Sequence, residues 1–527
     1  MKNDQIKSTP IQQLIMKHQR SSLLIISLTI VSLFQLFMPL STKAQLYPKA
    51  WPEKRFMDSS VQVLLDVLSI PNDAAFPKEI DRNIQWMDQQ LTKRGFKVTL
   101  LPSAARPFVF AEYQVDPKLP TVLYYMHFDG QPVAASAWKQ PNAYIPVFKK
   151  KTDTGWMIIP RPKPSQSFDP EWRVFARSSS DDKGPIAMFL AAIDMLRIQG
   201  KQPAYNVKLI LDSEEEKGSP NLPAMVKQHA GLLKSDRFVI LDGPRHNSNQ
   251  PTLLFGCRGV ADIEMEVFGP RFDQHSGHYG NYAPNPALEL SKLLVSMKDE
   301  KGQVLIPGFY KGITISEDVR KDLLAVPDKK EAINRQIGIA KEVNPDLSYQ
   351  ESLQYPSLNI LNFTSGEPEI GTRNIVPSFA KANVDIRLVP ESDPVHIENI
   401  VRKFIREKGF HIIENRKPTE EERMKYPKII SIYFRLSSLA FVTEPNTPTG
   451  LWASGIVEKL FGVKPVKIRM SGGTVPIAPF IRELAIPAVL VPTVNPDNSQ
   501  HAANENLRLA NYFEGVQLTY EILRTGF

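Results

Sequence analysis

Apolar residues in the first half of the chain follow two periods that alternate along the sequence. Residues 61–70 (VQVLLDVLSI) and 83–95 (NIQWMDQQLTKRG) repeat at helical spacing, whereas 121–127 (TVLYYMH) and 206–212 (NVKLILD) are continuous apolar runs of strand length. Residues 184–200, between these two runs, predict a helix that ends at its final glycine. Strands that alternate with helices predict βαβ units and therefore a mostly parallel sheet.

The pattern changes after Arg258. Residues 259–269 and 380–389 alternate apolar and polar positions, which predicts strands with one buried face. The polar segment 315–350 between them predicts surface helices, and the proline-rich segment 158–170 upstream predicts an exposed loop. These features favour an antiparallel, half-covered sheet in a second domain of the α+β class.

The alternation of helix and strand returns near the end of the chain. Residues 453–462 and 511–526 predict helices, and 486–494 predicts a buried strand. The α+β domain is therefore predicted to be inserted into the α/β domain. The predicted bounds are 1–44 for a signal peptide, 45–258 and 441–527 for the two parts of the α/β domain, and 259–440 for the insert.

Length and composition agree with two soluble domains. The chain has 527 residues, which exceeds the size of one core, and it is 42% hydrophobic and 23% charged. Half of its formal charge of +8 comes from residues 1–44, so the rest carries only +4. No basic tract interleaved with aromatic residues is present, which disfavours nucleic acid as a partner.

The N-terminus has the pattern of a targeting segment. A basic region precedes the apolar run 21–40, and Thr42 and Ala44 suit positions −3 and −1 of a cleavage site before Gln45. The run is also long enough for an uncleaved anchor, although a proline near its end and the small residues favour cleavage. Either way the body of the protein is predicted to be exported, to the periplasm or the medium. A stable membrane partner is expected only if the segment stays uncleaved.

Cys257 is the only cysteine, so no intrachain disulfide can form even in an oxidising compartment. It follows an apolar run, where a small buried side chain is the favoured interpretation over a catalytic thiol.

Five potential metal ligands occur at or just after predicted strands, and the chain has no H-E-x-x-H helix. They are His127, Asp181, Glu216, Asp242 and His501. Sites in open α/β sheets form outside the carboxyl ends of the strands, and two imidazoles with three carboxylates suit two zinc ions. Three negatively charged carboxylates against two divalent cations would leave one net positive charge, which is enough to hold a hydroxide. This charge balance indicates a hydrolase. The residues alone also allow interpretations without a metal. His127 could be a hydrogen-bonded core histidine, Asp181 and Glu216 could lie in solvated acidic loops, and His501 could be an ordinary exposed histidine.

Eight motifs strengthen the hydrolase interpretation. HFDGQPV, SSSDDKGP, EEKGS, the aspartate of VILD, GCRG, HSG, SGGTVPIA and QHAANE occur in the order and context of the di-zinc exopeptidases, from about residue 55 to 525. The chain resembles that family, which includes carnosinase, cytosolic non-specific dipeptidase, carboxypeptidase G, aminoacylase and succinyl-diaminopimelate desuccinylase. HFDGQP, YPSLNI and the helical segment of the insert are most similar to the dipeptidase branch. The resemblance implies an α/β, mostly parallel-sheet catalytic domain with an inserted α+β lid and dimerisation domain.

The resemblance also implies two zinc ions per chain, with Mn²⁺ or Co²⁺ as other candidates. His127 and Asp242 would hold one ion, Glu216 and His501 the other, and Asp181 would bridge both. The family pattern makes Asp129 the carboxylate that orients the His127 imidazole, as ligating histidines need. Relatives usually carry G-R-G ahead of the bridging aspartate, whereas residues 176–178 are A-R-S here. The resemblance therefore does not predict the local backbone conformation.

The remaining roles follow from the same resemblance. Among three consecutive glutamates, the pattern E-E-x-G-S makes Glu215 the general base and Glu216 the ligand. His275 would stabilise the oxyanion in the partner subunit, which implies a homodimer through the insert. Arg387 is a candidate to grip a substrate carboxylate, although a solvated strand face would explain it nearly as well. The other expected substrate-binding elements are Asn374 and the turn Ser471, Gly472, Gly473 and Thr474.

The sequence therefore predicts an exported metallo-exopeptidase that cleaves dipeptides or short peptides with a water activated at a dinuclear zinc centre. One alternative is an N-acyl-amino-acid amidohydrolase (an aminoacylase or deacylase) with the same metal chemistry. A more distant alternative is a binding protein that has lost catalysis, against which the intact ligand set and Glu215 argue.

Overall fold

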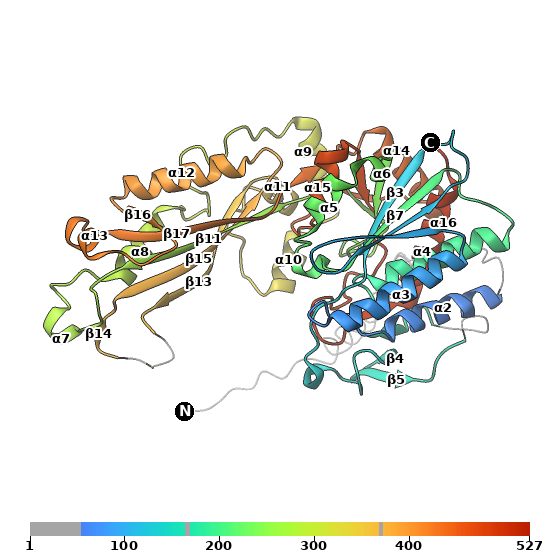
Figure 1. Cartoon of the computed structure of the whole chain (residues 1–527), viewed down its shortest axis with the longest axis horizontal. Coiled ribbons are helices and arrows are strands. Elements are labelled where there is room, and N and C mark those ends of the chain that lie inside the picture. The colour runs from blue at the N-terminus through green and yellow to red at the C-terminus, as the bar shows by residue number, and fades with distance from the viewer. Residues whose placement is uncertain (1–53, 164–168, 368–370, 372) are drawn as a thin grey trace, which may run out of the picture. The chain divides into compact units, whose positions relative to one another are not determined.

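The computed structural model describes residues 54–163, 169–367, 371 and 373–527 (Figure 1). The predicted signal peptide, residues 1–44, lies outside these ranges, as does part of the predicted loop 158–170. Residues 158 and 159 belong to strand β5 (Gly155–Ile159), so the prediction of a loop was wrong at its start. Within the described ranges, no helix combines the length and the apolar character needed to cross a membrane.

An eight-stranded sheet forms the centre of the first region, with the strand order β1-β2-β7-β3-β8-β20-β9-β19. The strands are β1 (Lys97–Leu101), β2 (Phe108–Tyr113), β3 (Thr121–His127), β7 (Asn206–Asp212), β8 (Arg237–Ile240), β9 (Thr252–Leu254), β19 (Val466–Ile468) and β20 (Ala488–Leu490). Four of the seven pairings are parallel, and β3 lies between its parallel neighbours β7 and β8. The predicted strands 121–127 and 206–212 coincide with β3 and β7, and the mainly parallel sheet is confirmed.

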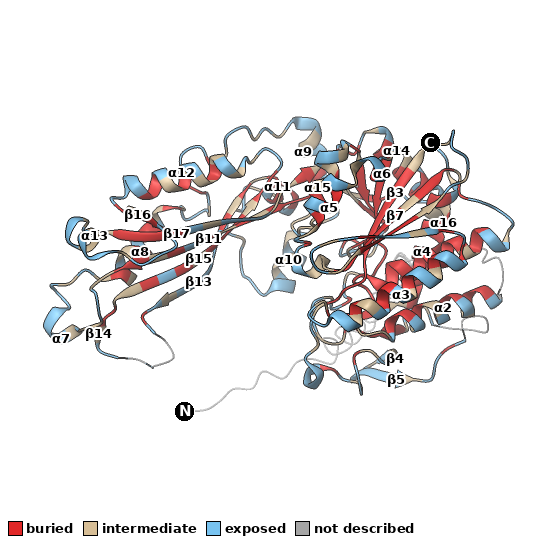
Figure 2. Cartoon of the chain, in the orientation of Figure 1, coloured by how far each residue is buried: buried red, intermediate tan, exposed pale blue. Residues whose placement is uncertain are grey.

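Helices cover both faces of this sheet, which explains why its inner strands are apolar without alternation. Val122, Tyr124 and Met126 of β3 belong to one buried cluster, and Leu123 and Tyr125 belong to another (Figure 2). The first face carries α2 (Lys54–Leu68), α3 (Pro77–Lys93), α4 (Lys183–Ile198), α14 (Pro448–Phe461) and α16 (Leu509–Arg524). The second carries α5 (Leu222–Gln228), α6 (Ala230–Leu233) and α15 (Ala478–Leu484).

The predicted helices of this region are confirmed at their expected places. The predicted helix end at residue 200 is also confirmed, because α4 stops at Ile198 and Gly200 takes φ +64°. A four-stranded sheet that the sequence analysis did not anticipate lies beside these helices. Its order is β21 (Asn506–Arg508), β6 (Arg173–Phe175), β4 (Val147–Thr152) and β5.

A five-stranded sheet lies within the residues predicted as the insert. Its order is β13 (Ser357–Ser365), β15 (Phe379–Leu388), β11 (Gly259–Phe268), β17 (Ile429–Ser438) and β16 (His411–Glu414). Helices α8 (Pro286–Ser296) and α12 (Pro394–Glu407) cover one face, where Ala382, Val384 and Ile386 are fully buried. The predicted half-covered sheet is thus present, but β16 pairs with β17 in parallel, because α13 (Glu420–Lys425) connects them.

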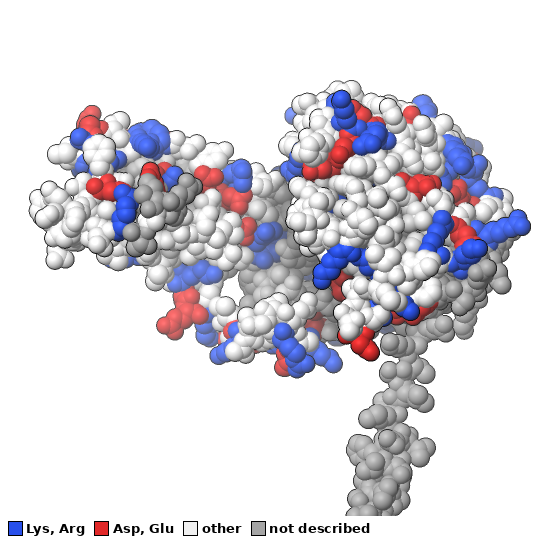
Figure 3. Space-filling model, turned by 90° about the horizontal axis from the view of Figure 1, so that it is seen from below, with Lys and Arg blue, Asp and Glu red and all other residues white. Residues whose placement is uncertain are grey.

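The polar segment between the alternating strands forms helices, as predicted. They are α9 (Glu317–Leu324), α10 (Lys330–Ile337) and α11 (Tyr349–Leu353). A small ribbon of β12 (Gln274–His275) and β14 (Ile375–Val376) next to α7 (Ser276–Tyr279) completes this region. A second ribbon, β10 (Gly256–Cys257) with β18 (Phe441–Val442), lies just outside the predicted bounds of the insert. Basic and acidic side chains are interspersed on the face shown in Figure 3.

Candidate metal centre

The five predicted ligands meet at one edge of the eight-stranded sheet. His127 is the last residue of β3, Asp242 lies two residues beyond β8, and Glu216 follows β7 in a short 3₁₀ turn. Because β3, β7 and β8 are parallel neighbours, their carboxyl ends open on the same edge. Asp181 precedes α4, and His501 lies in the loop between β20 and β21.

Asp181 lies between the two imidazoles with one carboxylate oxygen toward each. His127 Nε2 is 2.9 Å from Asp181 Oδ1, and His501 Nε2 is 3.0 Å from Asp181 Oδ2. The donor atoms form two groups, each with its atoms within 4.8 Å of one another: His127, Asp181 and Asp242, and then Asp181, Glu216 and His501. These nitrogen and oxygen donors suit zinc and similar divalent ions, and the grouping equals the assignment expected from the family resemblance. Metal binding by the individual atoms stays a prediction.

The electrostatics of the cluster also fit cations. Burial and the charge of Asp181 raise the pKa of Glu216 to about 7, and burial raises the pKa of Asp242 to about 6. Burial also raises the pKa of Glu215 well above its usual range, with Asp242 and Asp181 adding to the effect. Buried carboxylates that repel one another are stabilised when a divalent ion neutralises them.

Asp129 connects the histidine ligand to the glutamate turn. Its Oδ1 lies 3.3 Å from His127 Nδ1, although this contact is not aligned as a hydrogen bond. Its two carboxylate oxygens accept hydrogen bonds from the backbone N–H groups of Glu215 and Glu216, each at 3.1 Å. Asp129 therefore occupies the position expected of a carboxylate that orients both sides of the site.

The three consecutive glutamates point to different surroundings. Glu216 Oε2 lies 3.3 Å from His501 Nε2, and Glu215 Oε2 lies 4.0 Å from His127 Nε2. Glu214 Oε2 instead accepts a hydrogen bond from Asn221 Nδ2 at 2.7 Å. This geometry agrees with Glu216 as a ligand and Glu215 as an unligated carboxylate beside it.

Glu505 holds the loop that carries Asp181, a role that the sequence analysis did not assign. Its fully buried carboxylate accepts hydrogen bonds from Arg177 Nη1 and from the backbone N–H groups of Ser178 and Ser180, all at 2.8 Å, and of Asp181 at 3.0 Å. Ser178 has φ +59°, so a serine takes the left-handed conformation that glycine adopts more readily. Glu505 belongs to the QHAANE motif, which was the available signal for its importance. Its role could not be predicted because its hydrogen-bond partners lie more than 300 residues earlier in the chain.

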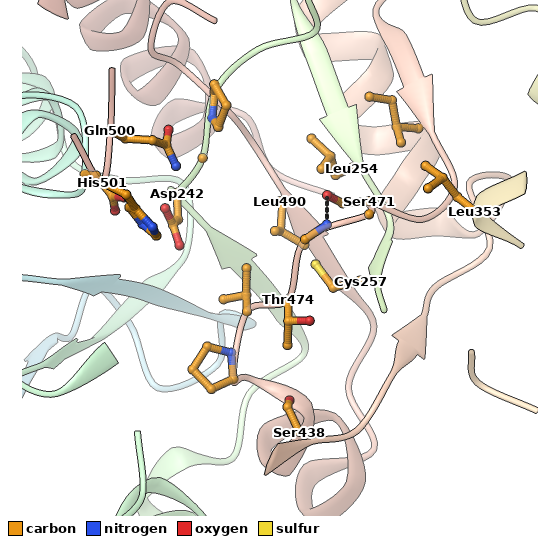
Figure 4. A pocket seen from close by; sticks show the side chains of 18 of the residues that line it. Asp242, Leu254, Cys257, Leu353, Ser438, Ser471, Thr474, Leu490, Gln500 and His501 are labelled. Atoms are coloured by element: carbon orange, nitrogen blue, oxygen red, sulfur yellow. Dashed lines mark hydrogen bonds and ion pairs between the residues drawn. The ribbon is translucent and has the colours of Figure 1, made fainter. Parts of the chain in front are cut away.

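A cavity of about 560 Å³ opens beside the ligands, within the usual range for small-molecule sites. Figure 4 shows Asp242, His501, Ser471 and Thr474 among the side chains around it. The predicted turn Ser471, Gly472, Gly473 and Thr474 lines the cavity throughout. Cys257 also lines it and is buried, as predicted. The insert contributes further lining residues, which are Asp328, Tyr349, Gln350, Leu353 and others.

Arg387 joins this turn through Thr474. Its Nη1 donates to Thr474 Oγ1 at 3.2 Å, and its Nε donates to Asp385 Oδ2 at 3.2 Å. Thr474 Oγ1 in turn donates to the carbonyl of Arg258 at 2.7 Å. The structure therefore brings Arg387, predicted to grip a carboxylate, next to the glycine turn.

His275 and Asn374 lie together but away from the ligands of their own chain. His275 is exposed, and the carbonyl of Asn374 accepts a hydrogen bond from the backbone N–H of Ser276 at 3.0 Å. The Gly259 end of β11 adjoins the cavity, whereas His275 follows the Phe268 end, about 30 Å along a strand of ten residues (Figure 1). Neither residue contributes to the centre of the same chain.

Comparison with known proteins identifies the family. The sequence profile described as Peptidase family M20/M25/M40 matches residues 123–525, so the chain belongs to this family. It is a metal-dependent peptidase, and the resemblance predicted from the eight motifs is confirmed.

Relatives and solved structures agree with this assignment. The Beta-Ala-His dipeptidase of Rattus norvegicus is 26% identical over 488 residues, which cover 88% of this chain and 91% of the relative. The Cys-Gly metallodipeptidase of Schizosaccharomyces pombe is 26% identical over 420 residues, covering 78% and 81%. An M20 family metallo-carboxypeptidase from Sulfolobus solfataricus superposes with a TM-score of 0.72 at 26% identity, covering 88% of this chain and 98% of that chain. Human carnosine dipeptidase 1 has the same fold, with a TM-score of 0.68 at 24% identity, covering 90% and 99%.

Proposed function

We propose that the protein hydrolyses the peptide bond of dipeptides with the help of two zinc ions. The observation that carries the proposal is the shared Asp181, which lies between two groups of donors beside an open cavity. The names of the relatives, dipeptidases for Beta-Ala-His and for Cys-Gly, support dipeptides as the substrate class.

The metals and the protein have separate tasks in this proposal. His127, Asp181 and Asp242 would hold one ion, and Asp181, Glu216 and His501 the other. When bound, such ions polarise a carbonyl oxygen and lower the pKa of water to about 7. Glu215 takes a proton from the attacking water as the new C–O bond forms. It then gives that proton to the leaving amine as the C–N bond breaks.

Arg387 and the glycine turn would hold the C-terminal carboxylate of the substrate. The guanidinium is already oriented by Asp385 and Thr474, which leaves its remaining donors for a carboxylate. Gly472 has no side chain to separate its backbone N–H group from the ligand, whereas the N–H of Gly473 already donates to Ser471 Oγ at 3.2 Å. Asn374 lies near His275 and would bind the substrate together with that histidine.

We further propose a homodimer through the insert. β13 is an edge strand, and its Ile360, Leu361 and Phe363 are about half exposed. Leu288 and Val295 of α8 are also exposed, and α8 contacts β13. Exposed apolar residues on a sheet edge favour pairing with another chain. In such a dimer His275 would reach the partner's centre and donate a hydrogen bond to the developing oxyanion.

Export is the last part of the proposal, and it is tested separately. It rests on the N-terminal targeting pattern of the sequence. Mass spectrometry of protein recovered outside the cytoplasm should find an N-terminus at Gln45. A membrane-bound chain that retains residues 21–40 would instead establish the anchor.

One assay tests the activity. Purified protein with zinc is incubated with dipeptides, N-acetyl amino acids and longer peptides, and the released amino acids are quantified. Dipeptides are expected to be cleaved fastest. Cleavage of only the N-acetyl amino acids would replace the proposal with an amidohydrolase, and no cleavage of any compound by fully metal-loaded protein would favour a binding protein.

A further inference from the structure

Helix α11 of the insert packs directly on the glycine turn that lines the cavity. A Cβ atom placed on Gly472 would lie 3.2 Å from Leu353 Cδ2 and 3.9 Å from the hydroxyl of Tyr349. Leu353 and Tyr349 both line the cavity as well. The wall of the site next to the turn is therefore made by two side chains from the insert.

A buried polar network fixes α11 in this place. Asp328 accepts from Gln350 Nε2 at 2.6 Å and lies 2.9 Å from His246 Nε2, which follows the strand end that carries Asp242. His246 matches none of the sequence motifs. Arg469 Nη1 also donates to the side chain of Gln354 at 2.8 Å. Because these contacts join α11 to elements of the α/β region, Leu353 has a defined position over the cavity.

Three neighbouring strands of the eight-stranded sheet supply apolar side chains to the cavity lining. Leu254 of β9 pairs with Ile468 of β19 on one side and with Leu490 of β20 on the other, and all three line the cavity. In Figure 4, Leu353 lies on the side of Ser471 away from Asp242 and His501, Leu254 lies next to Ser471, and Leu490 lies between Ser471 and Asp242. The part of the cavity lined by Leu353 is therefore separated from the predicted metal ligands by the turn.

We propose that Leu353, Leu254 and Ile468 form a subsite that selects an apolar side chain on the C-terminal residue of the dipeptide. The inference rests on the proposed function, in which the turn holds the C-terminal carboxylate. A substrate gripped there presents its C-terminal side chain beside Gly472, where Leu353 lies. A charged side chain would lose its hydration in this subsite, since the nearby Asp328 is already engaged by His246 and Gln350.

The subsite is tested with the zinc-loaded full-length protein and matched pairs of dipeptides. Ala-Leu should exceed Ala-Gly and Ala-Asp in kcat/KM by on the order of 10- to 100-fold, as expected for apolar pockets. Leu-Ala and Gly-Ala should differ much less. Leu353→Ala should lower the ratio of Ala-Leu to Ala-Gly by about tenfold and favour Ala-Phe, because it enlarges the subsite. Leu353→Trp should fill the subsite and therefore raise kcat/KM for Ala-Gly relative to that for Ala-Leu.

Leu324→Ala is the matched control, because Leu324 lies exposed on α9 in the same insert and outside the cavity lining. It should leave every ratio unchanged. An equal loss for all substrates in Leu353→Ala would mean a merely structural residue and would overturn the proposal. The proposal would also be overturned if dipeptides are cleaved with a preference for the N-terminal side chain, or with no preference for either side chain. Failure to cleave any dipeptide would instead overturn the proposed function.

Discussion

The edge of the eight-stranded sheet and the tip formed by β12, β14 and α7 both carry residues predicted to act in catalysis, yet they are built differently. At the sheet edge, His127 is completely buried and Asp181 is 6% exposed, and hydrogen bonds or ion pairs surround both. At the tip, His275 is exposed, and its ring accepts only a bond from the backbone N–H of Gly277 within the described contacts.

The contrast separates two ways of making a catalytic site. The sheet edge is organised by the fold of one chain, because the supporting contacts hold the ligands in place before any metal arrives. Among the described residues, the contacts of the His275 ring at the tip are with Gly277 and with the ring of His278, so we expect His275 to acquire its catalytic geometry against another surface. The two regions should therefore respond differently to substitution.

Asp181→Ala should remove both metal ions and all measurable activity, because this carboxylate faces both imidazoles. Elemental analysis of the purified variant measures the metal content. Asp153→Ala, in the exposed turn between β4 and β5, is the control and should keep two ions. Retention of one ion by the Asp181 variant would show that the two groups of donors are independent.

Glu215→Gln should retain both ions but lose about 100- to 10,000-fold in kcat, the usual contribution of general acid–base catalysis. Glu214→Gln is the neighbouring control and should change kcat little, since Glu214 is bonded to Asn221. Metal content and turnover are measured on the same preparations. If the Glu214 variant has the larger defect, the assignment of the three glutamates is shifted by one residue.

His275→Ala should lower kcat by about 100- to 1,000-fold, as loss of an oxyanion donor does, with no change in metal content. Mixing it with Glu215→Gln protein under conditions that exchange subunits should restore activity, because one site of the mixed dimer regains both residues. Absence of recovery, with exchange proved by mass spectrometry, would place His275 outside the partner's site.

Glu505→Gln should weaken metal binding by about 10- to 100-fold, the usual cost of losing support behind a ligand. A neutral amide cannot accept all four hydrogen bonds that the carboxylate receives from Arg177 and the Asp181 loop. Competition with a chelator measures the affinity, and Glu458→Gln on the exposed side of α14 is the control. An unchanged affinity would mean that the loop keeps its shape without Glu505.

Sequence patterns predicted the parts of the molecule whose signals are local. β3 and β7 are continuous apolar runs because both their faces are buried, and the ligands follow them directly. Strands of three residues, such as β9, β19 and β20, are too short to show a period, so their directions and order could not be predicted.

Long-range polar contacts could not be predicted from the sequence, for a different reason. Glu505 meets Arg177, and His246 meets Asp328, only after the chain has folded. Each of these residues by itself has the pattern of an ordinary surface residue. The conformation of Ser178 was likewise hidden, because serine has no strong preference for positive φ.

The wide spacing of the ligands sets the order in which the protein can mature. The first predicted ligand is His127 and the last is His501, and the supporting Glu505 follows it, just ahead of α16, which packs on α4. An emerging chain therefore holds only a partial site until its C-terminal part is available, and contacts of such sequence separation form slowly. Metal capture becomes a late event in biogenesis, so a chain cut short before residue 501 should be both metal-poor and prone to degradation, even though most of its sheet has been synthesised.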